Sequence, residues 1–235
     1  TWSLGTRGPV TLRIGEVVNL VTARNITADL QGDYPWTEDN PLLLTNVKVE
    51  TLGGKITMQQ LRMPQHDPAL LRVDNISSSE LISAVNPKQF AMSGPVSGAL
   101  PFWLDNEKWI IKDGWLTNPG PMTLRIDKDT ADAIVKDNMV AGAAINWLRY
   151  MEISRSWTRI NLDNLGELTM QATIKGTSRV DGKSSSVNLN YTHDENVFTL
   201  WRSLRFGDNL QTWLEQHAAL PDNRCPTGKE CKEQP

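Results

Sequence analysis

Histidine and cysteine are the side chains best suited to catalysis or metal binding, and this chain has few of them. It contains the histidines His66, His193 and His217 and the cysteines Cys225 and Cys231. The histidines lie far apart, and no HxxxH, HExxH or DxD spacing links them to carboxylates as a metal site would require. The sequence also has no GxSxG turn of a serine hydrolase and no phosphate-binding loop. We therefore predict a protein that is not an enzyme and holds neither a cofactor nor a metal.

The two cysteines stand in a short polar segment near the end of the chain. Residues 225–231 read CPTGKEC, and the proline and glycine can turn the chain so that the two sulfur atoms meet. A zinc site would need two further ligands, and the nearest histidine, His217, stands alone. A disulfide between Cys225 and Cys231 is the better interpretation, and it indicates an oxidising compartment.

Charge and hydropathy exclude several classes of protein. The net charge is −3, and no run of Lys or Arg forms a basic cluster in the sequence. This argues against nucleic-acid binding and against electrostatic docking on anionic lipid headgroups. No run of about 18 apolar residues is present, so no segment is expected to span a bilayer. The chain begins without Met and without a signal-peptide pattern, and we expect it to be a fragment of a longer protein.

Two segments of the chain occur twice. Residues 8–14 (GPVTLRI) return as residues 120–126 (GPMTLRI), and residues 52–59 (LGGKITMQ) return one residue shorter as residues 165–171 (LGELTMQ). Both copies alternate apolar and polar residues in the manner of β-strands. The repetition predicts a repeated β-unit and an elongated, stacked architecture, although short alternating strands can also resemble each other by chance.

Most of the chain is predicted to form strands, in three regions. Residues 1–76 form a β-repeat unit with a hairpin turn at Gly53-Gly54. Residues 77–206 combine a short helix, a β-meander, a long helix, further strands and another helix. Residues 207–235 form a C-terminal helix and a polar tail.

Three helices are predicted within the middle region. A capping box of Ser77 and Glu80 predicts a helix over 77–85. Apolar residues at helical spacing predict helices over 129–151 and 194–204, the second capped by residues 193–195. The strands 167–174 and 187–191 are predicted to be joined by a polar loop over 176–186.

The predicted helices are too few to cover the predicted strands. Two or three helices stand against about ten strands, and one helix covers only a few strands. Much of the apolar sheet face must therefore pack on another sheet or stay open as a groove. An open face of that length would bind a ligand or a partner. The tryptophans at 103, 109 and 115 are interpreted as packing residues of one meander.

Two stretches of the middle region resemble a known family. Residues 92–104 (MSGPVSGALPFWL) and 109–116 (WIIKDGWL) are similar to the G-x-x-S-G-x-L-P … I-x-D-G-x-L signature of the YdbH family. Leu148, Tyr150, the run 166–168, Gly176 and the run 187–196 match further along. The likeness covers most of residues 77–206 and extends through the tail. The YdbH family belongs to the AsmA-like proteins, which are related in architecture to TamB.

The resemblance implies a fold and a function. It implies a mainly β protein with a few helices, forming an elongated, twisted antiparallel β-groove, taco-like, with short amphipathic helices at its side or end. It implies a bridge that carries phospholipids between the inner and outer membranes of a Gram-negative envelope. The full-length protein would be anchored in the inner membrane, with this part in the periplasm. The implied partners are phospholipids, the outer-membrane lipoprotein YnbE, docked by β-strand augmentation, and the periplasmic protein YdbL.

In this interpretation acyl chains lie along an apolar track of strand residues, although each of these residues also fits an ordinary sandwich core. The candidates are Val10, Leu12, Ile14, Val47, Val49, Ile56, Met58, Leu100, Phe102, Leu104, Met122, Leu124, Ile126, Leu168, Met170, Val187 and Leu189. The alternative is a periplasmic protein-interaction module in which the same β-edge serves assembly and lipid never contacts this segment.

Overall fold

The computed structural model describes residues 4–18, 21–85, 90–126, 149–180 and 182–199. The chain divides into two compact units, Thr1–Glu195 and Asn196–Pro235. The sheet described below belongs to the first unit.

The described residues are almost entirely strands. In chain order the elements are β1 Leu4–Gly5, β2 Val10–Val18, β3 Thr22–Gln31, β4 Asp33–Tyr34, β5 Leu42–Thr51, β6 Gly54–Met63, β7 Ala69–Ser77, α1 Ser78–Val85, β8 Phe90–Ser93, β9 Pro95–Phe102, β10 Trp109–Thr117, β11 Met122–Ile126, β12 Tyr150–Asp163, β13 Glu167–Val180 and β14 Lys183–Asn196. The fold is mainly β with short helices, as the sequence predicts.

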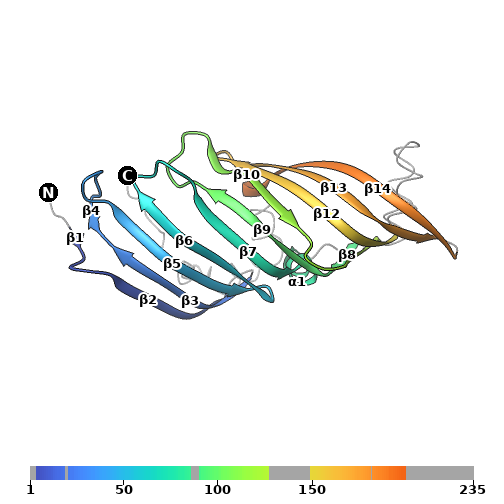
Figure 1. Ribbon diagram of the computed structural model, residues 1–235, viewed down its shortest axis with the longest axis horizontal. Coiled ribbons are helices and arrows are strands. Elements are labelled where there is room, and N and C mark those ends of the chain that lie inside the picture. The colour runs from blue at the N-terminus through green and yellow to red at the C-terminus, as the bar shows by residue number, and fades with distance from the viewer. Residues whose placement is uncertain (1–3, 19–20, 86–89, 127–148, 181, 200–235) are drawn as a thin grey trace, which may run out of the picture. The chain divides into compact units, whose positions relative to one another are not determined.

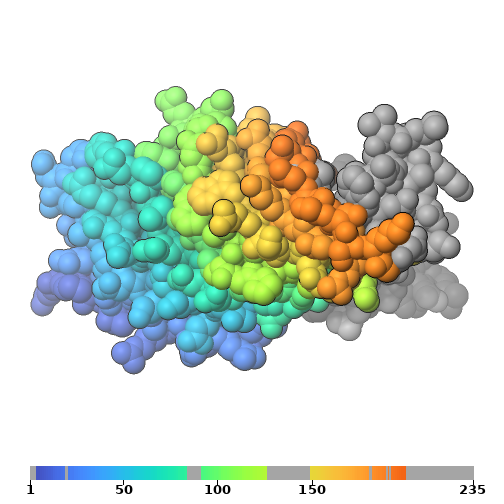
Figure 2. Space-filling view, turned by 45° about the vertical axis from the view of Figure 1, so that its right-hand side comes forward, coloured from blue at the N-terminus to red at the C-terminus, as the bar shows by residue number. Residues whose placement is uncertain are grey.

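One large antiparallel sheet contains 12 of these strands. Its order is β14-β13-β12-β10-β9-β7-β6-β5-β3-β2, with β11 beside β12 and β8 beside β11. The order largely follows the chain, so most strands pair with one that shortly precedes them, whereas β8 pairs only with the later strand β11 (Figure 1). The surface shows the same progression, with colours following one another from blue to orange (Figure 2). The sheet is open, ending at β2 on one side and at β14 on the other.

The sheet has one apolar face, which we call the inner face. Opposed residues of neighbouring strands lie on the same face. Leu44 lies opposite Leu61, and Leu61 belongs to a buried cluster with Met58 and Met63. A second cluster buries Met122, Met151, Ile153 and Val187. The opposite face, which we call the outer face, carries mostly polar pairs, such as Lys48 with Thr57.

Four residues with left-handed backbone interrupt strands of this sheet. They are Asn25 (φ 49°) in β3, Asn46 (φ 52°) in β5, Asn75 (φ 50°) in β7 and Asp113 (φ 55°) in β10. Each coincides with a register shift toward a neighbouring strand, so each marks a one-residue β-bulge. Asn and Asp tolerate this conformation better than other non-glycine residues.

The bulges keep apolar side chains on one face. An extra residue reverses the alternation of a strand, so that inner residues on the two sides of a bulge are three positions apart instead of two. Val73 and Ile76 flank Asn75, and both are buried. Leu44 and Val47 flank Asn46 and pack on the same cluster. Without the bulge, one half of each strand would present its apolar residues to the outer face.

Three predicted elements differ from the structure. The predicted loop 176–186 is wrong, because β13 continues to Val180 and β14 begins at Lys183. Small residues allow this: Gly176 and Ser178 lie opposite Ile153 and Met151, where little space is left for a larger side chain.

The predicted helix 129–151 is wrong at its end, because Tyr150 and Met151 belong to β12 and pair with β11. Residues 129–148 lie outside the described residues.

The predicted helix 194–204 begins later than expected. Residues 194–196 end β14, residues 197–199 are helical, and the Asn196 side chain accepts a hydrogen bond from the Thr199 amide at 2.9 Å. The cap is therefore Asn196 and not residues 193–195.

The first helix is confirmed. It begins at Ser78, and the Ser77 hydroxyl accepts a hydrogen bond from the Glu80 amide at 3.3 Å.

The hairpin turn at Gly53-Gly54 is also confirmed, with Gly53 at φ 72° between β5 and β6. The repeated segment at 165–171 forms the equivalent turn between β12 and β13, with Gly166 at φ 86°. The region boundaries predicted at residues 76 and 206 stay predictions.

Candidate functional site

The inner face brings together most of the residues predicted for an apolar track. Register and cluster membership place on it Val10, Leu12, Ile14, Val47, Val49, Ile56, Met58, Leu100, Phe102, Met122, Leu124, Leu168, Met170 and Val187. Leu104 lies beyond the end of β9 and is 58% exposed, so it stands apart from this set. Ile126 and Leu189 are residues of β11 and β14. These residues therefore share one face of the sheet, and their role as a lipid track stays a prediction.

Burial varies along the inner face. Met58 and Met122 are about 5% and 4% exposed, whereas Leu12 and Ile14 on β2 are 42% and 48% exposed. Because β2 is the last strand on its side of the sheet, its side chains have a neighbour on one side only. The apolar face is thus accessible to a ligand or partner at β2 and closely packed in the middle.

Sequence reasoning missed several inner residues. These are Leu61, Met63, Ala69, Val73, Ile76, Met151, Ile153 and Ile160, all less than 9% exposed. Strict alternation from Met58 places Leu61 on the other face, since the two residues are three positions apart. β6 itself contains no Asn or Asp, and the signal lies in the partner strand β5, where Asn46 stands between Leu44 and Val47, the residues opposite Leu61 and Met58.

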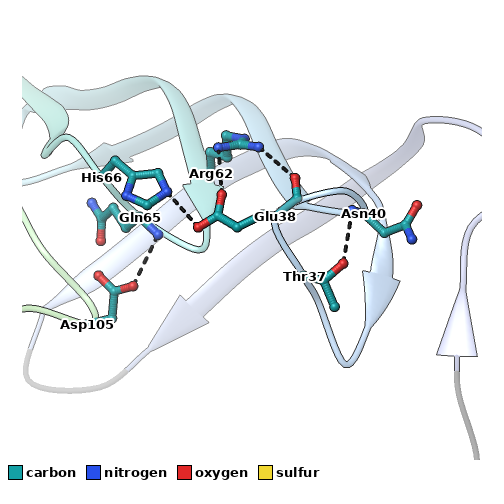
Figure 3. Close-up of polar contacts among 7 residues, drawn as sticks. All are labelled: Thr37, Glu38, Asn40, Arg62, Gln65, His66 and Asp105. Atoms are coloured by element: carbon teal, nitrogen blue, oxygen red, sulfur yellow. Dashed lines mark hydrogen bonds and ion pairs between the residues drawn. The ribbon is translucent and has the colours of Figure 1, made fainter.

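A polar cluster joins three loops at one end of the strands (Figure 3). The Glu38 carboxylate contacts His66 Nε2 at 2.6 Å through one oxygen and Arg62 at 3.7 Å through the other. Arg62 also donates to the Glu38 carbonyl oxygen at 3.1 Å. The Asp105 carboxylate accepts from the Gln65 amide at 3.1 Å. These contacts tie the loop before β5 to the loops after β6 and β9, and no nucleophile stands among them.

The other histidines are not gathered into a site. His193 contacts the Glu195 carboxylate at 3.3 Å, and His217 lies outside the described residues, as do Cys225 and Cys231. Within the part of the chain that the structure describes, no three His, Cys, Asp or Glu side chains converge as metal ligands. In that same part, no helix is long and apolar enough to cross a bilayer.

A cleft on the described part of the sheet is polar. Its volume is about 980 Å³, and it lies where the β5–β6 turn meets the start of α1. Arg24 and Lys55 line it together with the carboxylates of Glu50, Asp74 and Glu80. Its mixed charge, with two cations and three anions, favours no one class of ligand, so the inner face is the better candidate site.

Comparison with known proteins identifies the family. The model of the YdbH-like family, described as intermembrane phospholipid transport protein YdbH, matches residues 1–219. The curated protein named "Probable phospholipid transport protein YdbH" from Escherichia coli (strain K12) is 80% identical over 232 residues, which is 99% of this chain and 26% of that protein. No solved structure matches the chain. The chain spans about a quarter of the length of this relative, and it belongs to the YdbH-like family of intermembrane phospholipid transport proteins.

Proposed function

We propose that this chain is the distal segment of a bridge-like protein that carries phospholipids between the two membranes of a Gram-negative envelope. The observation that carries the proposal is the continuity of the apolar inner face from β2 to β14, opposite a polar outer face. Membership of an intermembrane phospholipid transport family supports the choice of lipid over other apolar ligands. The protein has no catalytic role in this proposal.

The physical task is to move acyl chains without exposing them to water. Each buried CH₂ group is worth about 0.8 kcal/mol, so a bare two-chain lipid cannot cross water quickly. Acyl chains on the inner face would exchange water for side chains such as Leu12 and Ile14, while the headgroup stays hydrated. The face lowers the barrier to movement and supplies no energy.

The edge strand β14 supports a second part of the proposal, the docking of an outer-membrane lipoprotein. β14 is 14 residues long and is the last strand on its side of the sheet, with β13 as its neighbour among the described strands. A partner strand can add to such an edge through backbone hydrogen bonds. The lipoprotein YnbE would extend the sheet in this way, and YdbL would act beside it in the periplasm.

Photo-crosslinking in cells tests the lipid track. A probe at Leu124 or Met170 points to the inner face, and a probe at Lys48 or Thr57 points to the outer face of β5 and β6, far along the sheet order from β11 to β13. We expect phospholipid to be captured from Leu124 and Met170 and not from the two outer-face controls. Capture of a small protein with no lipid at any of these positions would contradict the track and support an interaction module.

Proline substitution tests the docking edge. Successive residues of an edge strand direct their N–H groups alternately to the neighbouring strand and away from it. Of Asn188→Pro and Leu189→Pro, one removes an N–H of the β13 ladder and the other removes an outward N–H. We expect the outward variant to fold normally and to lose YnbE binding, whereas Asn188→Ala and Leu189→Ala keep it. Normal YnbE binding by both proline variants would contradict docking at β14.

A further inference from the structure

The outer face carries a group of basic residues that the linear sequence does not reveal, so the expectation that the chain has no basic cluster is wrong for this face. Arg125 in β11, Arg155 and Arg159 in β12, and Lys175 and Arg179 in β13 are all exposed. The chain carries −3 overall and these residues are spread over 55 positions, from 125 to 179. Folding places them on three neighbouring strands.

The register shows that they share the outer face. Arg155 lies directly opposite Lys175, and Arg159 lies opposite Trp115 of β10. Arg125 lies opposite Tyr150, with its guanidinium carbon 5.8 Å from the Tyr150 ring centre. We call Arg125, Arg155, Trp157, Arg159, Lys175 and Arg179 the outer basic patch.

An aromatic side chain lies between the cations. Trp157 stands between Arg155 and Arg159 in the alternation of β12 and remains 50% exposed. Its indole stacks on Trp115 with ring centres 4.8 Å apart and an interplanar angle of 9°. The stack fixes the orientation of Trp157, so that a rigid apolar surface is presented to solvent between two guanidinium groups.

The charge of the patch is not neutralised within the protein. The five cations outnumber the carboxylates near them: Glu152 lies on β12, and Asp113 on β10, two residues from the partner of Arg159, already contacts Lys112 at 3.9 Å. None of the five forms an ion pair with a carboxylate of the described residues. Such a surface is hydrated and screened by salt in solution, and it attracts anionic partners.

We propose that the outer basic patch docks on the anionic headgroups of a phospholipid bilayer. Arg guanidinium groups bind phosphate oxygens through paired hydrogen bonds, and Lys adds a point charge. Trp favours the interface between headgroups and acyl chains, where its indole is half in apolar surroundings and half in water. An acidic protein would also contact the cations and the tryptophan, since Arg and Trp are common at protein interfaces. Binding to lipid vesicles that contain no protein separates the two occupants. This docking does not depend on the lipid track, because it uses the opposite face of the sheet.

Vesicle co-sedimentation of the full 235-residue chain tests the proposal. Vesicles of phosphatidylcholine with phosphatidylglycerol are compared with vesicles of phosphatidylcholine alone. We expect binding to the anionic vesicles only, falling as salt is raised. The double variant Arg155→Glu with Arg159→Glu should lose at least about tenfold in partitioning, because each cation near an anionic surface contributes about fivefold. Trp157→Ala should lose a smaller factor at unchanged charge.

A matched control keeps the test specific. Arg13→Glu with Lys48→Glu makes the same change in net charge on the outer face of β2 and β5, far along the sheet order from the patch. We expect this control to bind like the unmodified chain. Equal losses in both double variants, or equal binding to the two kinds of vesicle, would overturn the proposal. Lipid capture at Met170 that persists while vesicle binding is absent would overturn this inference and leave the lipid track intact.

Discussion

At the scale of single residues, the bulge positions determine which face the apolar side chains reach. The Asn46 side chain donates to the Asp29 carboxylate at 3.1 Å, and the Asn25 side chain donates to the Glu50 carboxylate at 2.7 Å. The Asn75 amide donates to the Ser97 hydroxyl at 2.9 Å. These residues combine a tolerance of positive φ with a hydrogen bond to the next strand. Each bulge is therefore fixed both by conformation and by a contact.

Substitution of Asn46 measures the conformational part. Asn46→Val places a β-branched residue at positive φ and should reduce the free energy of unfolding by about 1–3 kcal/mol. Asn46→Gly accepts the conformation and loses the side-chain hydrogen bond, which is worth about 1 kcal/mol or less. Lys48→Val, on the outer face of the same strand, is the control for adding valine. Urea unfolding gives the three values, and equal effects of valine at 46 and 48 would contradict a conformational cost.

The Asp29 carboxylate reports on the same contact. Hydrogen bonds from Asn46 and then from Thr11 hold its pKa below the ordinary value of 3.8. A lowered pKa in the folded state means that Asp29 contributes stability above pH 3.8 and that this contribution is lost as the pH falls through the folded pKa. In Asn46→Gly we expect the pKa of Asp29 to rise toward its ordinary value. An NMR titration of the Asp29 side chain measures it, and an unchanged pKa would show that Asn46 is not the main cause.

At the scale of elements, the sequence predicted strands better than helices. Alternation located the hairpin at Gly53-Gly54 because turn residues and strand periodicity agree there. It failed at Met151, since Leu148 and Met151 fit a helical stripe while residues 150–153 also alternate as a strand. Pairing with β11 decides in favour of the strand, and a tertiary contact of that kind is not visible in a local pattern.

The candidate site was predictable to the extent that alternation is unbroken. Val10, Leu12 and Ile14 were assigned to one face correctly, because no bulge lies between them. Leu61 was missed because the reversal of alternation in β5 and β6 depends on the backbone angle of Asn46. The outer basic patch could not be predicted, because it depends on the register of three strands.

Gly98 in β9 lies so close to the backbone of β10 that no residue with a side chain fits there. A Cβ atom on Gly98 in β9 would lie 2.0 Å from the Trp115 carbonyl oxygen in β10. Gly98→Ala must therefore separate the two strands, and we expect a loss of at least about 2 kcal/mol in unfolding free energy. Gly15 in β2 is the matched control, because a Cβ there meets nothing within 4 Å. Similar unfolding midpoints for Gly98→Ala and Gly15→Ala would contradict the strand contact.

At the scale of the whole molecule, stability is expected to be uneven along the sheet. Met151 is fully buried, and Ile153 and Ile160 are 3% and 7% exposed, whereas every residue of β2 is exposed. β2 also has one neighbouring strand and no second one among the described elements. Local opening should therefore be easiest at β2 and hardest in β12.

Hydrogen exchange tests this unevenness. We expect the amides of β2 to exchange well before those of β12, with β6 and β7 between them. The binding of acyl chains to the inner face should slow exchange in β2 most, because its apolar residues have the most surface left to bury. Equal protection of β2 and β12 in the lipid-free protein would contradict the expectation.

The agreement between strand order and chain order has a consequence for how the molecule is made. A chain that crosses a membrane from its N-terminus emerges on the far side strand by strand, and in this sheet nearly every strand finds its partner among residues that have already emerged. Pairing of this kind closes short loops, which is the fastest route to a β-structure. The sheet can thus grow one hairpin at a time as the chain emerges. A chain that is halted partway would already hold its first strands together, with a single edge ready for the next strand.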